Sequence, residues 1–329
     1  GGMTHAFAST LYTPPGPEVV SMADWLAYGL PVGPMSDTAR KGFFYWSVMR
    51  MQYGDAADLA EMDWRLGQEY IKLPGGDILP HGTGYNGITD RLAAGLNIRT
   101  GIIVESIQYD EAGVTVGSSA GTFTARQLIL TVPLSLLQAG AINFTPALAP
   151  AKQGAIQRIG YGHYEKLALR FDRFYWPREK NRFNYLPDEE NPLFTGWLNL
   201  GHFSGVPIIV VYHSGSRALR TNEWSDETLI RKALAVMGRL FGQEYGPIPW
   251  PEAYLRTEWA ADPLARGSYS FDKVGQQPGD RAALAAPVGN RLFFAGEATH
   301  PHYYATVHGA YESGIRAARE LLASQETKG

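Results

Sequence analysis

The stretch that decides the fold is Arg291–Gly314, RLFFAGEATHPHYYATVHGAYESG, near the C-terminus of a chain of 329 residues. Its apolar start predicts a buried strand, which ends in a turn at Gly296 and leads to the acidic Glu297. A loop rich in His and Tyr follows, and a helix is expected to begin near Thr306. A helix N-terminus carries unpaired N–H groups and partial positive charge, which suit a ligand oxygen that gains negative charge. By spacing alone, however, this corner is more typical of ordinary strand-to-helix packing.

The predicted C-terminal helix carries one continuous face of apolar or small side chains at helical spacing. This face comprises Val307, Ala310, Tyr311, Gly314, Ile315, Ala318, Leu321 and Leu322. Small residues on the same helix, among them Gly309, Gly314 and Ala317, would let another backbone or a flat ligand approach closely.

Composition limits the classes of function. With 45% hydrophobic and 19% charged residues, the chain is expected to be a soluble globular protein. A net charge of −3 gives no basic stripe, so nucleic acid is not expected as a partner. The absence of cysteine excludes disulfides and thiolate metal sites. No apolar run approaches the roughly 18 residues of a membrane span, and no signal peptide is visible, so a cytoplasmic location is expected.

The pattern of predicted elements changes along the chain. Residues 1–69 contain helices at Met22–Tyr28 and Thr38–Met51. Residues 70–140 alternate helices with apolar strands such as Gln127–Val132, which favours an α/β nucleotide-binding core. Other elements predicted in this part are a helix at 88–96 and a hairpin of strands at 98–110 and 114–116.

Residues 141–285 have a mixed α+β character. Strands are predicted at 164–171, 196–202 and 206–213, and helices at 149–158 and 226–241. In the first of these strands, Leu167 and Leu169 share a face, and Lys166 lies on the opposite face with Arg170. Residues 286–329 then return to the nucleotide-binding domain. The sequence therefore predicts an α/β fold with a Rossmann-like domain interleaved with an α+β domain.

One feature of a Rossmann-type domain is missing from the start of the chain. Such a domain normally opens with strand–GxGxxG–helix, in which glycines let the backbone approach a diphosphate. The letters do occur at Gly82–Gly87, before a predicted helix. The preceding Ile78–His81 is too short and too broken for the required buried strand, so a glycine-rich turn is the favoured interpretation. The Rossmann-like domain is therefore predicted to be incomplete.

Five separate blocks resemble motifs of one family. They are ITDRLAAGLNIRTGIIVESI (88–107), LTVPLSLL (130–137), GYGHYEKLALRFDRFYWP (160–177), RTEWAADPLARGSYSF (256–271) and FFAGEAT with ATVHGAYESG (293–314). Their sequence, order and spacing resemble the FAD-dependent amine oxidases, which include polyamine oxidases, monoamine oxidases and lysine-specific histone demethylases. The resemblance runs from about Ile71 to the end, about three-quarters of the chain.

The resemblance implies an FAD-binding domain interleaved with a substrate-binding domain. Four segments are expected: a partly helical substrate-domain segment at 1–69, FAD-binding parts at 70–140 and 286–329, and the substrate-binding domain at 141–285. The residues implied to contact FAD are Val104, Pro133, Trp259, Gly296, Glu297, Thr306 and Val307. Val104 would lie against the adenine.

The resemblance also implies the residues of the reactive side. Lys166 occupies the position of a lysine that holds a water near flavin N5, so it is the candidate catalytic residue. Trp259 and Tyr269 would line the substrate pocket as an aromatic wall. Thr306 stands where monoamine oxidases place a second tyrosine, which favours a polyamine-like substrate over a small monoamine. Ser268 stands near the position of a flavin-linking cysteine, so FAD is expected to be non-covalent.

The implied reaction is oxidation of an amine with O2 as the final electron acceptor. Two alternatives stay open. An L-amino-acid oxidase would need a cation for the substrate carboxylate, for which Arg170 and Arg173 are candidates. A non-catalytic fragment or subunit would retain FAD poorly, and the missing GxGxxG unit could come from a second chain, another segment or self-association.

Two further kinds of site are not expected. His300, His302 and His308 are close in sequence, but their spacing matches no helical zinc motif and no carboxylate completes a set, so no metal is expected. The sequence also contains no G-x-S-x-G elbow of a serine hydrolase.

Overall fold

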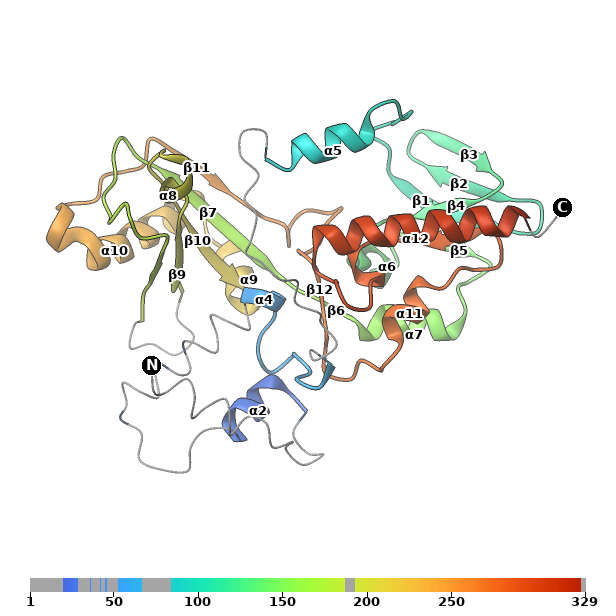
Figure 1. Cartoon of the computed structure of the whole chain (residues 1–329), viewed down its shortest axis with the longest axis horizontal. Helices are drawn as coiled ribbons and strands as arrows, with labels where there is room; N and C mark the ends of the chain where they lie inside the picture. Colours follow the sequence, from blue (N-terminus) through green and yellow to red (C-terminus); the bar gives the residue numbers. More distant parts are fainter. Residues whose placement is uncertain are drawn as a thin grey trace.

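The computed structural model describes residues 20–28, 36, 42, 45, 53–66, 84–186 and 193–326. Most of the predicted helix Thr38–Met51 and the first residues of the Gly82–Gly87 motif lie outside these ranges. The described residues form two lobes that lie side by side along the longest axis of the molecule (Figure 1). The chain crosses between the lobes several times, because segments distant in sequence share each of them.

The first lobe is built on a five-stranded antiparallel sheet of order β11-β7-β10-β9-β8. Its core is rich in aromatic residues, and Trp176 and Trp197 are almost completely buried. Helix α10 buries an apolar stripe against this core, and Ser225 caps its N-terminus by accepting a hydrogen bond from the Thr228 N–H at 3.3 Å. The elements are β7 (Tyr164–Arg170), β8 (Arg182–Asn184), β9 (Gly196–Asn199), α8 (Gly201–Ser204), β10 (Ile208–Ser214), α9 (Ser216–Asn222), α10 (Asp226–Tyr245) and β11 (Ala253–Arg256).

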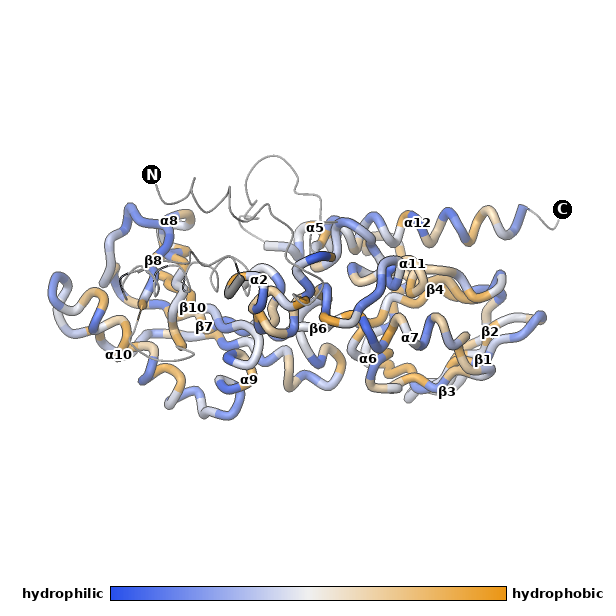
Figure 2. The backbone as a smooth tube through the Cα atoms, turned by 90° about the horizontal axis from the view of Figure 1, so that it is seen from below, coloured by the Kyte–Doolittle hydropathy of each residue, from blue (hydrophilic) through white to orange (hydrophobic). Residues whose placement is uncertain are grey.

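The second lobe is layered. A parallel pair, β4 with β13, lies between helix α12 on one face and a four-stranded sheet of order β3-β2-β1-β5 on the other (Figures 1 and 2). Phe293 faces α12, whereas Leu292 and Phe294 face the other core. The elements are α5 (Asn86–Ala93), β1 (Val104–Tyr109), β2 (Val114–Ser118), β3 (Gly121–Ala125), β4 (Leu128–Leu130), α6 (Leu134–Gln138), β5 (Asn143–Thr145), α7 (Pro150–Arg158), α11 (Asp280–Ala285), β13 (Leu292–Phe294), the 3-10 turn η3 (Glu297–Thr299) and α12 (Val307–Glu326).

A short ribbon joins the lobes. Strand β6 (Gly160–Tyr161) pairs antiparallel with β12 (Ser270–Phe271), and helices α2 (Met22–Tyr28) and α4 (Tyr53–Asp55) lie beside it. Glycine is required at Gly160 because a Cβ there would overlap the ring of Phe271, at 2.5 Å from its nearest atom. The close approach of these two strands sets how the lobes meet.

Most predicted elements are confirmed, with shorter or longer bounds. The strand at 164–171 is β7, and its exposed side chains include Lys166 and Arg170, as predicted. The helix predicted at 88–96 ends earlier, at Ala93, because Gly95 adopts a left-handed φ of 81°. The strand predicted at 196–202 stops at Asn199, after which α8 begins.

Only part of the predicted apolar face of the terminal helix packs against the lobe: Leu321 joins the cluster of Phe293 and Ala317, and Ala310 lines a cavity. Helix α12 buries Gly309, Ser313 and Ala317. A Cβ at Gly309 would overlap the carbonyl oxygen of Tyr303, so glycine is required there, whereas at Gly314 no described atom lies within 4 Å of a Cβ. Four members of the predicted face are instead exposed: Val307, Tyr311, Ile315 and Leu322. Sequence periodicity located an apolar stripe that the described chain covers only in part.

Candidate cofactor and active site

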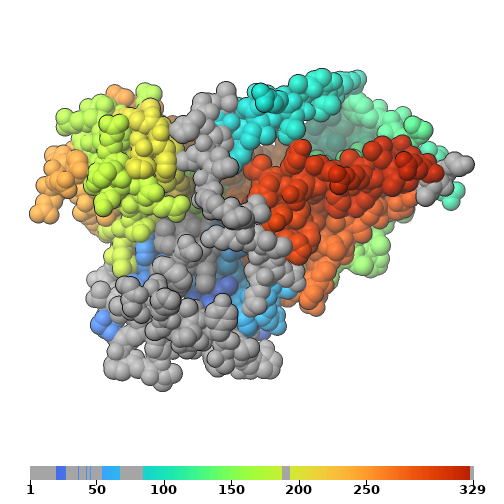
Figure 3. Space-filling model, viewed as in Figure 1, coloured from blue at the N-terminus to red at the C-terminus, as the bar shows by residue number. Residues whose placement is uncertain are grey.

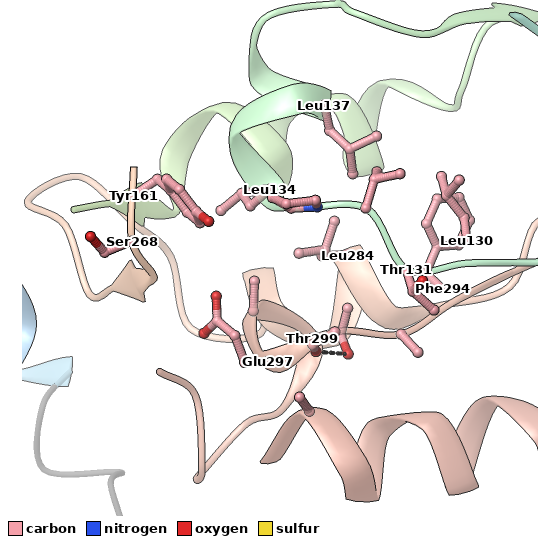
Figure 4. A pocket seen from close by; sticks show the side chains of 16 residues that line it. Leu130, Thr131, Leu134, Leu137, Tyr161, Ser268, Leu284, Phe294, Glu297 and Thr299 are labelled. Carbon is pink, nitrogen blue, oxygen red and sulfur yellow. Dashed lines mark hydrogen bonds between the residues drawn. The ribbon is translucent and has the colours of Figure 1, made fainter. Parts of the chain in front are cut away.

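A cavity of about 230 Å³ opens where β4 and β13 end (Figure 4). Its lining comes from the ends of both strands, from α6 and from the loops beside the ribbon: Leu130, Thr131, Val132, Pro133, Leu134, Leu137, Tyr161, Ser268, Leu284, Phe294, Ala295, Gly296, Glu297, Ala298, Thr299 and Ala310. The carboxyl ends of parallel strands are where α/β sheets bind ligands. The volume lies below the roughly 300–1,000 Å³ of sites that enclose a whole drug-sized ligand, so the cavity has room for a flat ring system rather than for an entire dinucleotide.

Local backbone geometry shapes the edge of this cavity. Gly296 has φ of 125°, a conformation that side chains disfavour, so the turn after β13 requires glycine. The Gly296 N–H donates to the Ser313 hydroxyl at 2.9 Å, and the Thr299 hydroxyl donates to the Gly296 carbonyl at 2.8 Å (Figure 4). The turn is thereby fixed to both η3 and α12.

The Glu297 carboxylate holds three segments together. It accepts hydrogen bonds from the Ser270 N–H at 3.0 Å, the Ser270 hydroxyl at 2.7 Å and the Ala305 N–H at 2.5 Å. Ala305 has a left-handed φ of 59°, which costs a non-glycine residue about 1–3 kcal/mol. Glu297 therefore fixes the loop before α12 in a strained conformation at the edge of the cavity.

A buried polar network behind Glu297 was not predicted from the sequence. Arg281 forms an ion pair with Asp272 at 2.8 Å and donates to the Ser270 hydroxyl at 2.8 Å. The Tyr304 hydroxyl donates to Asp272 at 2.7 Å. Burial, together with the negative charge of Asp272, raises the pKa of the nearby Asp55 to about 7, although Arg281 opposes the shift. Nothing in a single sequence marks such charged residues as buried.

Two residues in or beside the ribbon, Tyr161 and Ser268, line the cavity but were not among the residues predicted to contact FAD. Tyr161 projects from β6 toward the cavity, and burial, with the charge of Glu297, raises its pKa to about 12 (Figure 4). The Ser268 hydroxyl accepts from the Tyr164 N–H at 2.8 Å and lies 3.1 Å from the Tyr164 carbonyl. The glycines on both sides of Tyr161 were the available signal for this close-packed position.

The residues predicted for the reactive side lie around β7. Lys166 projects from its exposed face, with Nζ 5.7 Å from the ring centroid of Tyr164. Although much of the side chain is exposed, desolvation by the surrounding protein lowers its pKa. The Tyr164 ring lies 6.2 Å from that of Tyr269. Burial and the charge of Asp55 raise the pKa of Tyr269, so its hydroxyl stays protonated. Trp259 is 46% exposed and lines a separate, open depression with Arg256 and neighbouring residues.

The structure brings some of the predicted cofactor residues together and separates others. Pro133, Gly296 and Glu297 line one cavity. Thr306 caps α12, since its hydroxyl accepts from the Gly309 N–H at 3.0 Å, and Val307 is exposed. Val104 lies on β1, packed against the core of the second lobe rather than on the cavity.

Comparison with known proteins identifies the family. The model of the family described as flavin containing amine oxidoreductase matches residues 11–322. The chain belongs to this family. Among its curated relatives, polyamine oxidase 2 from Arabidopsis thaliana is 36% identical over 84% of this chain and 55% of its own length. Lysine-specific histone demethylase 1 homolog 2 from the same plant is 34% identical over 88% of this chain and 39% of its own length.

Solved structures show the same fold. Cyclohexylamine oxidase from Brevibacterium oxydans superposes with a TM-score of 0.75 at 21% identity, over 97% of this chain and 71% of that one. A putrescine oxidase bound to putrescine gives 0.77 at 17% identity, over 98% and 75%. The predicted α/β fold with interleaved FAD-binding and substrate-binding domains is therefore confirmed, whereas the four predicted segment limits stay predictions. The chain spans only 39–55% of the length of the two curated relatives above.

Two further observations concern other kinds of site. Among the described residues, no group of three or more His, Asp or Glu could hold a metal ion. His300 instead lies 3.0 Å from the Glu312 carboxylate. In the part of the chain that the structure describes, no helix is long and apolar enough to cross a bilayer.

Proposed function

We propose that this chain carries the catalytic part of an FAD-dependent amine oxidase. Bound FAD would supply the redox chemistry, namely removal of a hydride from the carbon beside the amine nitrogen and transfer of both electrons to O2, which would give H2O2 and an imine that water hydrolyses. The observation that carries the proposal is the cavity at the ends of β4 and β13, beside a lobe that presents a lysine and aromatic residues.

The residues present fit a flavin at this position. Leu130, Leu134 and Phe294 give the cavity an apolar lining suited to a flat ring, while Gly296 and Glu297 supply its polar edge. Val104, Thr306 and Val307 are proposed to contact other parts of FAD. Ser268 exchanges hydrogen bonds with the Tyr164 backbone and, as a serine, offers no thiol for a covalent link, which supports non-covalent FAD.

Lys166 is proposed to hold a water and move a proton near the reacting atoms. Its lowered pKa supports this role, because a lower pKa makes the ammonium group a stronger acid. Tyr269 and Trp259 are proposed to exclude water and orient the amine through their ring faces. Tyr269 and Trp259 are not among the residues that line the cavity. The support for these two roles is the family resemblance.

The proposed substrate is a polyamine-like amine. The names of the relatives, polyamine oxidase and putrescine oxidase, support this class. The cations that an L-amino-acid oxidase would need are engaged elsewhere: Arg170 pairs with Glu252 at 3.7 Å, and Arg173 lies 5.0 Å from the Tyr175 ring centroid. Peroxide production with spermidine, benzylamine and an L-amino acid tests the proposal. A clear preference for the amino acid would favour an L-amino-acid oxidase over a polyamine oxidase.

The FAD site is proposed to need a further segment, a second chain or self-association for completion. Among the described residues, β4 pairs with β13 alone, so its other edge is open to a further parallel strand. Helix α5 and the exposed face of α12 lie on the same side of the molecule (Figure 3). A chain that never retained FAD in any assembly would favour the non-catalytic alternative. A cytoplasmic location stays a prediction.

A further inference from the structure

Glu165 is a buried carboxylate that the proposed reaction does not use. It lies on β7, next to Lys166, but its side chain faces the opposite side of the sheet and is only 2% exposed. No Lys, Arg or His of the described residues forms an ion pair with it. Burying a carboxylate without a cation is unfavourable unless hydrogen-bond donors surround it. The groups that donate hydrogen bonds to Glu165 therefore indicate the role of this carboxylate in the fold.

Three donors reach Glu165 from distant parts of the chain. The Thr257 hydroxyl donates at 2.6 Å, the Ala260 N–H at 3.0 Å and the Asn222 side-chain amide at 3.3 Å. The first two come from the turn that follows β11, and the third comes from the end of α9. The two shortest contacts thus fix one turn, residues 257–260, to the interior of the first lobe.

The same turn is tied to the backbone of Lys166. The Lys166 N–H donates to the Thr257 hydroxyl at 2.8 Å, and the Thr257 N–H donates to the Lys166 carbonyl at 3.0 Å. The Thr257 hydroxyl therefore links the Lys166 backbone to the Glu165 carboxylate. Trp259 lies between Thr257 and Ala260, the two residues that Glu165 holds.

We propose that Glu165 is a positioning residue that fixes the Trp259 turn relative to Lys166. This inference rests on the proposed function, since it assigns Glu165 to the geometry of the proposed reactive side. A carboxylate suits the position because it accepts from several donors at once, whereas a neutral amide at the same place must turn a donor toward one of them. Loss of the carboxylate frees the turn while leaving Lys166 on its strand.

The first test needs no cofactor. The full chain is labelled with 5-fluorotryptophan, and Trp259→Phe assigns one of its 8 tryptophan resonances in a ¹⁹F NMR spectrum. Glu165→Gln and Thr257→Val are expected to shift or broaden the Trp259 resonance. Thr257→Ser keeps the hydroxyl and should restore the wild-type signal. Asn222→Ala removes a Glu165 contact outside the turn and serves as the matched control.

The second test measures reduction of bound flavin by amine. Glu165→Gln and Thr257→Val are expected to lower the limiting rate about tenfold, with a smaller change in the amine concentration for half-saturation. In a Trp259→Phe background the same changes should add less than twofold, because residues that act as one unit are not additive. If Glu165→Gln does not fold, Thr257→Val with Thr257→Ser decides the question.

The outcomes separate the two proposals. A flavin-loaded wild-type assembly whose flavin is not reduced by any of the amines overturns the proposed function, while the NMR comparison still decides whether Glu165 positions Trp259. A Trp259 resonance that is identical in wild type, Glu165→Gln and Thr257→Val overturns the positioning role, whatever the activity.

Discussion

The two lobes differ in how completely helices α10 and α5 bury their apolar side chains within the described chain. In the first lobe, α10 buries Leu229, Ile230, Ala233, Val236, Met237 and Phe241 against a five-stranded sheet. In the second, α5 buries none of its residues within the described chain, and Ile88 and Leu92 are about half exposed. Helix α10 therefore has a buried apolar side, whereas α5 leaves its apolar residues about half exposed. The parallel pair of the second lobe has two described strands.

This contrast matters because the parallel pair carries the candidate cofactor cavity. Parallel sheets are normally covered on both faces and extended at their edges. The exposed apolar residues Val307, Tyr311 and Ile315 recur every four residues along α12 and therefore share one of its faces. A continuous apolar face left exposed on a helix is typical of an interaction site. Helix α10, in the lobe of the candidate lysine, buries its apolar side, whereas helices α5 and α12, in the lobe of the candidate cofactor cavity, leave apolar residues exposed.

The largest expected effect is on the stability of the first lobe. Trp197→Ala should lower the free energy of unfolding by about 3–5 kcal/mol, because it empties a core position where the indole N–H donates to the Phe194 carbonyl at 2.7 Å. Leu92→Ala on α5 should change it by less than about 0.5 kcal/mol. Urea denaturation of both variants measures the difference. Equal losses would show that α5 is covered in solution.

The next effect concerns pH and the junction between the lobes. Because the pKa of Asp55 is raised from 3.8 to about 7, the folded state binds more protons than the unfolded state between these values. Stability therefore falls as pH rises from about 4 to 7, by an upper limit of about 4 kcal/mol at 1.36 kcal/mol per pKa unit. Asp55→Asn should be more stable than wild type at pH 8 and similar at pH 4. Urea midpoints that keep the wild-type pH slope in Asp55→Asn would contradict this origin.

A smaller effect is expected for Lys166, the proposed catalytic residue. Lys166→Met should slow flavin reduction or reoxidation by tenfold or more, about 1.4 kcal/mol, without unfolding the chain. Lys232 is a suitable control, because its Nζ also lies over an aromatic ring, 4.7 Å from the Trp224 centroid, but far from the cavity on α10. Stopped-flow traces of Lys166→Met that match Lys232→Met in both half-reactions would remove Lys166 from the mechanism.

The smallest effect on stability is expected from changes to the exposed apolar residues of helix α5. Replacing Ile88 and Leu92 with serine should change the unfolding free energy little, because both side chains are already exposed. If self-association covers this face, the same change should shift light scattering toward the monomer. An unchanged mass at every concentration would exclude self-association through α5.

The sequence was sufficient for features that depend on local pattern. Alternation predicted β7 and placed Lys166 and Arg170 on its exposed side, and the strand–turn–acid pattern predicted β13, Gly296 and Glu297. It was not sufficient for features that depend on what packs against a segment. The apolar stripe of α12 was located, but only packing shows that Gly309, Ser313 and Ala317 form the buried side.

Buried charges were beyond the reach of local pattern for the same reason. Asp272 and Arg281 are 9 residues apart, and their ion pair depends on how β12 and α11 meet. Alternation places Glu165 on the same face as Leu167 and Leu169, but its donors lie 57 to 95 residues away in the sequence and become visible only in the fold. Likewise, the family motifs identified Trp259, but they did not show which residues fix the turn that contains it.

Calorimetric titration of the isolated chain with FAD, at an oligomeric state fixed by light scattering, tests the contrast between the lobes most directly. The open edge of β4 and the exposed faces of α5 and α12 predict weak or undetectable FAD binding by the monomer, with binding gained when a further segment or a second copy covers them. A compact monomer that binds FAD with submicromolar affinity would contradict the prediction that the second lobe needs completion.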